Sequence, residues 1–169
     1  MWIINENGEN MMILYHGTTY NRFNRILNCK SIKVTSDELT HYRKTGYYST
    51  QNGYVYLTDN EYAALDFANR CFSNDECDAN CRLLVVLKIQ IDNDKVTLDD
   101  FENTESTTEI NNISYKSSKD ILVEDIKQIA FFQFSSFEKC CEFYDNQKFI
   151  NWSNINSEKK IWNGDLNIM

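Results

Sequence analysis

The chain has 169 residues, of which 42% are hydrophobic and 14% aromatic, enough apolar material for one core of domain size. A formal net charge of −8 excludes a general nucleic-acid coat protein, because binding along a phosphate backbone requires an excess of lysine and arginine. The longest apolar run, Leu83–Leu87, is far shorter than the roughly 20 residues of a membrane-spanning helix, so no membrane partner is expected.

The N-terminal segment predicts a cytoplasmic protein, because no basic stretch leads into a long apolar one as in a secretory signal. In that environment the six cysteines are expected to be free thiols. Cys71, Cys77 and Cys81 are spaced too widely for the tight turn that presents thiolates to zinc, so no metal site is predicted.

Charge is distributed unevenly along the chain. Residues 11–50 contain six lysines and arginines against two acids, whereas residues 92–125 contain ten acids against three lysines. A ligand that carries phosphate is therefore expected to meet the N-terminal quarter of the chain.

The first half of the chain predicts two strand-to-helix units. Ile13–Tyr15 predicts a strand that enters a turn at His16–Thr18, and the apolar spacing that follows predicts a helix through Phe23 and Leu27. After a short strand at 32–34, residues 37–53 have turn residues without a period and predict a loop.

The second unit begins with an aromatic strand at 54–57. Thr58 and Glu61 then have the spacing of a capping box, which predicts the start of a helix. One face of that helix is expected to carry the small and apolar residues Ala64, Phe67, Ala68 and Cys71.

The second half predicts mainly strands. Leu83–Ile91 is long enough for a central strand, and further strands are expected at 113–117 and 126–134. The acidic segment 92–112 has few apolar anchors and predicts a mobile connection. Phe137–Tyr144 predicts a short helix, and the polar tail offers Trp152, Ile155 and Trp162 as docking anchors. No repeat or linker is found, so one α+β domain over 1–169 is expected, with 146–169 as a candidate C-terminal extension.

Two motifs, in this order and about forty residues apart, resemble the ADP-ribosyltransferase superfamily, in the branch of diphtheria toxin and the poly-ADP-ribose polymerases. The first is His16-Gly17-Thr18, which is similar to the family's His-Gly-Ser/Thr at a strand end. The second is Tyr54-Val55-Tyr56-Leu57-Thr58-Asp59 before an alanine-rich helix, which is similar to the family's Gly-x-Tyr-Phe-Ala-Asp. The resemblance covers the first seventy residues.

The resemblance implies NAD as co-substrate and assigns roles to four residues. His16 and Thr18 would bind the NAD ribose, the backbone of Gly17 would hold the nicotinamide amide, and the ring of Tyr56 would stack on nicotinamide. His16 and Tyr56 would thereby belong to the catalytic set as well as to the NAD site.

The family's third element is a glutamate on a late strand, and here the sequence departs from the pattern. Aligning Ser114-Tyr115 with the family's Glu-Tyr places Ser114 at the glutamate position. Glu109 could serve if the strand is shifted or the loop is longer, and Asp120 is the candidate if a polymerase-like spacing from Gln128 is used. Glu109 ranks above Asp120 and Glu124 because a glutamate has the longer reach and it lies nearest the strand that should carry it.

The resemblance implies a split, mainly antiparallel sheet with short flanking helices, and a transferase of a toxin, mobile-element or phage-defence type. It would move ADP-ribose from NAD to a protein or nucleic acid, and a toxin of this type would have an antitoxin as partner. Two alternatives remain open: an NAD-using relative of the RNA 2′-phosphotransferases, which rely on basic residues in place of the glutamate, and a degenerate transferase fold that only binds.

Overall fold

The computed structural model describes residues 2–4, 8, 10–35, 52–72, 82–100, 112–154 and 167–168. These residues form an α+β fold with a mostly antiparallel sheet, called the large sheet here, and three α-helices. The strands of the large sheet are β1 (Trp2–Ile4), β2 (Asn10–Thr19), β4 (Val55–Thr58), β5 (Arg82–Asp92), β6 (Thr97–Leu98), β7 (Ser114–Ser117), β9 (Ile126–Phe134), β10 (Ser153–Asn154) and β11 (Asn167–Ile168).

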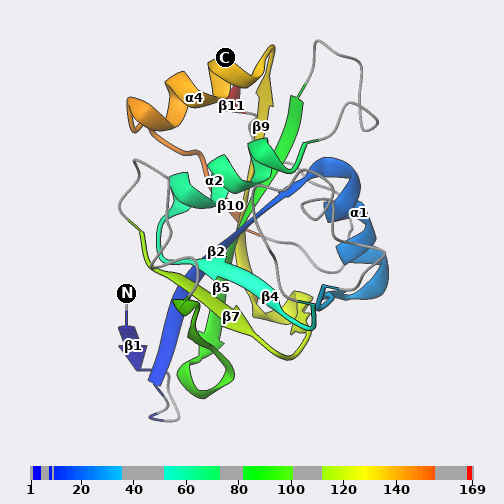
Figure 1. Ribbon diagram of the computed structural model, residues 1–169, viewed down its shortest axis with the longest axis vertical. Coiled ribbons are helices and arrows are strands. Elements are labelled where there is room, and N and C mark those ends of the chain that lie inside the picture. Colours follow the sequence, from blue (N-terminus) through cyan, green and yellow to red (C-terminus); the bar gives the residue numbers. More distant parts are fainter. Residues whose placement is uncertain are drawn as a thin grey trace.

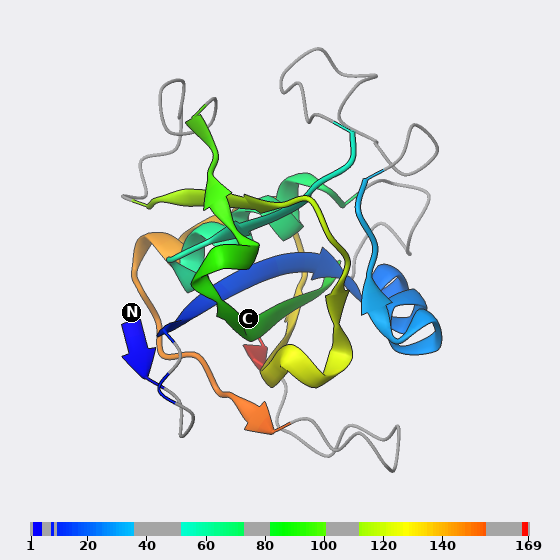
Figure 2. The ribbon, with the colours of Figure 1, turned by 90° about the horizontal axis from the view of Figure 1, so that it is seen from below.

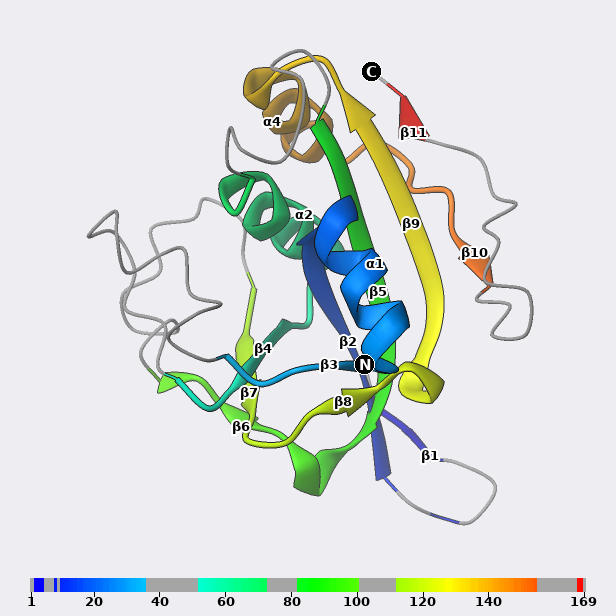
Figure 3. The same cartoon turned by 90° about the vertical axis from the view of Figure 1, so that its right-hand side faces the viewer.

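The order of strands across the large sheet is β10-β9-β5-β2-β4-β7-β6, with β1 added beside β2 and β11 beside β9. All of these pairs are antiparallel except β11 with β9. β3 (Ser31–Ile32) and β8 (Ile121–Leu122) form a separate two-stranded sheet. Figure 3 shows β5 and β9 side by side along the molecule, with β6 and β7 at the other edge.

The helices are α1 (Tyr20–Cys29), α2 (Glu61–Arg70) and α4 (Phe137–Asp145), and two short 3-10 turns are η3 (Asn93–Lys95) and η4 (Val123–Asp125). Figure 1 shows α1 on one side of the molecule and α2 with α4 on the other. No helix in the described ranges is both long and apolar enough to cross a membrane.

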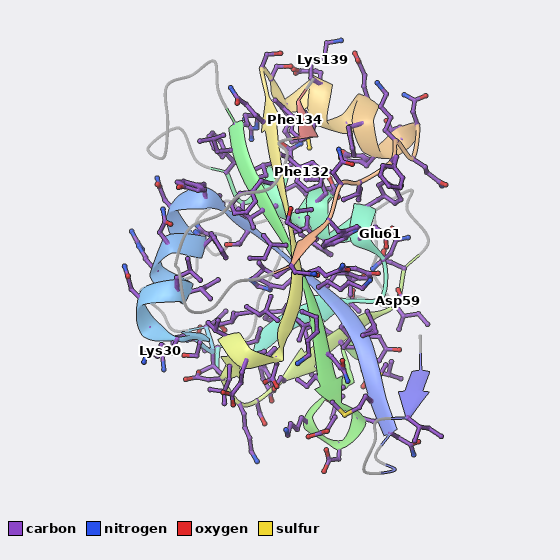
Figure 4. The ribbon with its side chains drawn as sticks, turned by 180° about the vertical axis from the view of Figure 1, so that it is seen from behind. Lys30, Asp59, Glu61, Phe132, Phe134 and Lys139 are labelled. Atoms are coloured by element: carbon purple, nitrogen blue, oxygen red, sulfur yellow. The ribbon has the colours of Figure 1, made fainter. Side chains whose placement is uncertain are left out.

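Two apolar clusters fill the two faces of the large sheet. Phe23 and Ile26 of α1 pack in one cluster with side chains of β2, β4 and β5. α2 and α4 pack in the other with alternate residues of β5 and β9, among them Phe132 and Phe134, whose rings lie 5.9 Å apart (Figure 4). The apolar run of β5 therefore contributes to both clusters, as the side-chain alternation of a central strand requires.

A buried polar link holds α4 on α2. The hydroxyl of Tyr144 donates to Asp66 Oδ1 at 3.1 Å, and Arg70 Nε lies 2.8 Å from Asp66 Oδ2. A buried carboxylate is costly unless it is paired, and these two contacts pair Asp66. The Tyr144 contact also ties α4 to α2, which packs on β2.

Most predicted elements are confirmed, including the two early helices, the central strand, the late strands and the C-terminal helix. Two expectations are wrong. His16–Thr18 continues β2 instead of forming a turn. The cap of α2 is Asn60, whose side chain accepts from Tyr62 N and Ala63 N, and not Thr58. Of the expected connection 92–112, residues 93–98 form η3 and β6, and residues 101–111 lie outside the described residues.

The C-terminal residues return to the sheet. β10 and β11 both pair with β9, and the ring of Trp152 lies 5.7 Å from that of Tyr15, which confirms Trp152 as a docking anchor. The other two expected anchors, Ile155 and Trp162, lie outside the described residues, as does most of the expected loop 37–53.

Candidate functional site

β2 and β4 separate at the position of the first motif. β2 pairs with β5 over nine positions, from Met11 to Thr19, but with β4 through the single pair Tyr15↔Thr58. On the β4 side of β2, residues 16–19 have no strand partner in the described part of the chain. Figure 2 shows β4 turning away from β2 toward the end of β2 that leads into α1.

The side chain of His16 bridges this separation. Its Nδ1 lies 2.9 Å from the carbonyl oxygen of Tyr56. Because a carbonyl oxygen can only accept, Nδ1 must carry the proton. In the neutral imidazole, Nε2 is then a hydrogen-bond acceptor, which can receive a hydroxyl proton.

The surroundings favour the neutral imidazole. Loss of hydration lowers the pKa of His16 below its ordinary value of 6.5. The hydrogen bond to the Tyr56 carbonyl opposes this change, while the positive charge of Arg22 acts in the same direction as burial. His16 is therefore an acceptor at Nε2, and not a cation, near neutral pH.

Gly17 lies against the backbone of α2. A Cβ atom added to Gly17 would stand 1.7 Å from the carbonyl oxygen of Ala64 and 3.1 Å from the backbone N of Ala68. No side chain fits in this space, so the glycine permits the close packing of α2 on β2. The sequence prediction gave a different reason for Gly17, the approach of a ligand to its backbone.

The two motif residues His16 and Tyr56 project from opposite faces of their strands. Met12 and Leu14 share a cluster with Val55 and Leu57, so alternation places His16 on the face of that cluster and Tyr56 on the face of α2. Thr18 lies on the same face of β2 as His16 and is only 3% exposed. A ligand that touched both His16 and the ring of Tyr56 would pass between β2 and β4.

Tyr56 lies in a small aromatic and basic group on β4 and β7. Its ring is 6.5 Å from that of Tyr54, and Lys116 is its partner across the strands. Lys116 Nζ lies 5.1 Å from the centre of the Tyr54 ring and 3.6 Å from Asp99 Oδ1. Tyr56 as a whole is half-buried.

The candidate carboxylates are in different surroundings. Ser114, at the position of the family's glutamate, is buried on β7 opposite Thr58. Asp120 receives Lys33 Nζ at 2.7 Å and the backbone N–H of Val34 at 2.9 Å, and these two hydrogen bonds lower the pKa of Asp120. Glu124 is exposed on η4, and Glu109 lies outside the described residues.

The structure therefore brings Tyr56 and His16 into contact, places Gly17 beside them, and holds Asp120 in a separate ion pair. Sequence reasoning did not single out Arg22, whose positive charge lowers the pKa of His16. Arg22 follows His16 by six residues in the sequence and lies in the first turn of α1. This spacing indicates an effect on the histidine only once β2 is known to pass directly into α1.

In the described part of the chain, no group of three or more His, Cys, Asp or Glu side chains could hold a metal ion. Comparisons of the chain with protein-family models, with curated proteins and with solved structures return no match.

Proposed function

We propose that the protein is an NAD-dependent ADP-ribosyltransferase with an ADP-ribosyltransferase-like fold. The observation that carries the proposal is the contact of His16 with the Tyr56 carbonyl at the point where β2 and β4 separate. The three elements named by the resemblance lie on adjacent strands, β2 with His16, β4 with Tyr56 and β7 with the position of the glutamate.

The separated edge of β2 suits a planar amide. Alternate residues of a strand direct their N–H and C=O groups to the same edge, and residues 16–19 have no strand on that side in the described ranges. The carboxamide of nicotinamide has one donor and one acceptor side and can pair with such an edge. Gly17 would supply the backbone, and the ring of Tyr56 the stacking surface.

His16 would act on the ribose. Its acceptor Nε2 can receive a ribose hydroxyl proton, which would fix the sugar while the bond between ribose C1′ and nicotinamide N1 breaks. That bond leaves its electron pair on neutral nicotinamide and positive charge on the sugar, as in glycoside cleavage. Positioning of this kind and a nearby carboxylate, for which Glu109 ranks first, would supply most of the rate increase.

A second candidate function rests on Arg22 and Ser114. A positive charge beside His16 and a serine where the family has glutamate favour the relatives of the RNA 2′-phosphotransferases, which use NAD with basic residues. In this reaction a 2′-phosphate would be lost from RNA and no macromolecule would keep the ADP-ribose.

One experiment separates these functions. The purified protein is incubated with a cell extract and NAD labelled in its adenylate, in parallel with 2′-phosphorylated RNA. Label on protein or nucleic acid supports the transferase, and loss of the 2′-phosphate supports the second candidate. If a correctly folded protein transfers no label and removes no 2′-phosphate, both proposed functions are contradicted, and a fold that only binds is left.

A further inference from the structure

We propose that single-stranded nucleic acid binds along the exposed face of α1 and is the acceptor of the ADP-ribose. This inference rests on the proposed function for the transfer step, but the binding it requires can be measured without NAD. The face is called the α1 surface here, and its members are Tyr20, Asn21, Arg25, Asn28 and Lys30, all exposed.

The segment that contains the α1 surface, residues 20–35, has the opposite charge to the rest of the molecule. From residue 20 to residue 35 the chain contains four cations and no acid, although the whole chain has a net charge of −8. The four cations are Arg22, Arg25, Lys30 and Lys33. Figure 4 shows Lys30 at the foot of α1, with Asp59 and Glu61 on the opposite side. A polyanion would therefore be attracted to one side of the molecule.

Neighbouring acids reduce this charge but do not cancel it. Asp120 pairs with Lys33, and η4, which carries the exposed Glu124, lies beside Lys30 because Val123 N donates to Lys30 O at 3.1 Å. With Asp125, which η4 also carries, four cations thus face three acids. This modest excess fits a flexible single strand better than a duplex, whose charge density requires a broader basic surface.

The uncharged members of the α1 surface also suit nucleotides. Tyr20 is 40% exposed while its ring packs at 6.2 Å on Phe131, so the ring is held and still presents surface on which a base can stack. Asn21 and Asn28 carry amides that can bond to base edges or phosphates. Single-strand binding sites combine these same elements, a basic track with an aromatic platform.

The α1 surface leads directly to the candidate site. β2 passes into α1 with no intervening loop, Thr19 caps the helix by accepting from Arg22 N at 3.5 Å, and Arg22 acts electrostatically on His16. A strand bound along α1 would thus bring a nucleotide to the sugar. There a nitrogen or oxygen of the nucleotide would bond to ribose C1′, the C1′–N1 electron pair would leave with nicotinamide, and the acceptor's proton would pass to water.

Binding is tested by fluorescence anisotropy of labelled single-stranded DNA and RNA, without NAD, from about 50 to about 200 mM salt. Arg25→Glu and Lys30→Glu are expected to weaken binding at least about tenfold, and each should reduce the salt slope by about 0.7 or more. The matched control is Lys139→Glu, an exposed lysine on α4 at the other end of the molecule, and it should bind as the wild type does.

Substitutions at Tyr20 provide an independent test of binding. Tyr20→Phe keeps the stacking ring and should bind normally, whereas Tyr20→Leu should weaken binding about tenfold, since stacking on an aromatic ring is lost. All variants are checked for folding by circular dichroism, and their NAD turnover in the absence of nucleic acid should equal that of the wild type.

Absence of binding at about 50 mM salt, or equal weakening by Lys139→Glu, would overturn the inference. Label transferred only to protein would overturn it too, while leaving the proposed function intact. Oligonucleotide binding through α1 without any NAD turnover would instead contradict the proposed function and the transfer step, and would confirm only the binding surface.

Discussion

The imidazole Nδ1 of His16 lies 2.9 Å from the carbonyl oxygen of Tyr56, forty residues later in the chain. This bond joins β2 to β4 just beyond their single backbone pair and fixes which nitrogen of the ring carries the proton. The same contact therefore stabilises the sheet and prepares Nε2 as an acceptor.

Substitutions at His16 should separate these two roles. His16→Asn can still donate to the Tyr56 carbonyl but has no ring nitrogen toward the ligand, so we expect near-normal stability with much weaker NAD binding. His16→Ala should lose about 1 kcal/mol of unfolding free energy in addition, because the carbonyl loses its partner. Urea unfolding and calorimetry with NAD check both; undiminished NAD affinity in either folded variant would remove His16 from the site.

The lowered pKa of His16 predicts a particular dependence of stability on pH. Below the ordinary pKa of 6.5 the unfolded chain binds a proton at this residue, while the folded protein resists it until a lower pH. The unfolding free energy should therefore fall as pH is lowered from 7 toward 5, and fall less in His16→Asn. Urea unfolding at each pH measures this free energy. An equal fall with pH in the two proteins would show that the pKa of the histidine is not lowered in the folded state.

Gly17→Ala should destabilise the protein by about 1–3 kcal/mol, because the added methyl would push on the backbone of α2. The obstacle is the carbonyl oxygen of Ala64, not its side chain, so Ala64→Gly should give no rescue. Unfolding midpoints of the single and double variants check this, and a Gly17→Ala protein of full stability would mean that α2 lies farther from β2.

The secondary structure could be largely predicted, since β5 has an unbroken apolar run and α1 and α2 have one apolar face. The errors arose where tertiary contacts decide. Gly17 was interpreted as a turn residue, yet it lies in a strand because a neighbouring helix needs the space. Thr58 is a good cap residue by itself, but it is still paired within β4, so the helix begins after Asn60.

The sequence identified His16 and Tyr56 as a pair but not how they meet. Their contact depends on the register between β2 and β4 and on the separation that follows, which no local pattern reports. Lys116 beside the tyrosines and Arg22 beside His16 were missed for the same reason, because cross-strand and strand-to-helix neighbours emerge only from long-range pairing.

Tyr56 is predicted to act through its ring. Tyr56→Phe should keep a near-normal KM for NAD, whereas Tyr56→Leu should raise it several-fold to a hundredfold, the range expected for loss of a stacked aromatic contact of about 1–3 kcal/mol. Tyr54→Leu, which removes the neighbouring ring just before β4, serves as the comparison and should change KM less than Tyr56→Leu. Steady-state kinetics decide, and a Tyr56→Phe enzyme as poor as Tyr56→Leu would assign the role to the hydroxyl.

The carboxylate can be assigned by charge-deleting variants at saturating NAD. Glu109→Gln should lower turnover about 10²–10³-fold if it faces the developing charge on the sugar. Asp120→Asn and Glu124→Gln should retain turnover, since the first serves an ion pair with Lys33 and the second is exposed. If none of the three loses tenfold, the glutamate-based mechanism is wrong and the function that relies on basic residues becomes the leading one.

Release of nicotinamide is the most direct test of the central claim, that His16 and Tyr56 form an NAD-cleaving site. Chromatography would follow free nicotinamide formed from NAD by the wild type and by His16→Asn, each in the presence of a cell extract that supplies acceptors and with the extract alone as the blank. We predict release by the wild type and at least about a hundredfold slower release by the variant, as for the loss of a group that acts in the transition state. Equal release by both proteins, or none above the blank from the folded wild type, would contradict it.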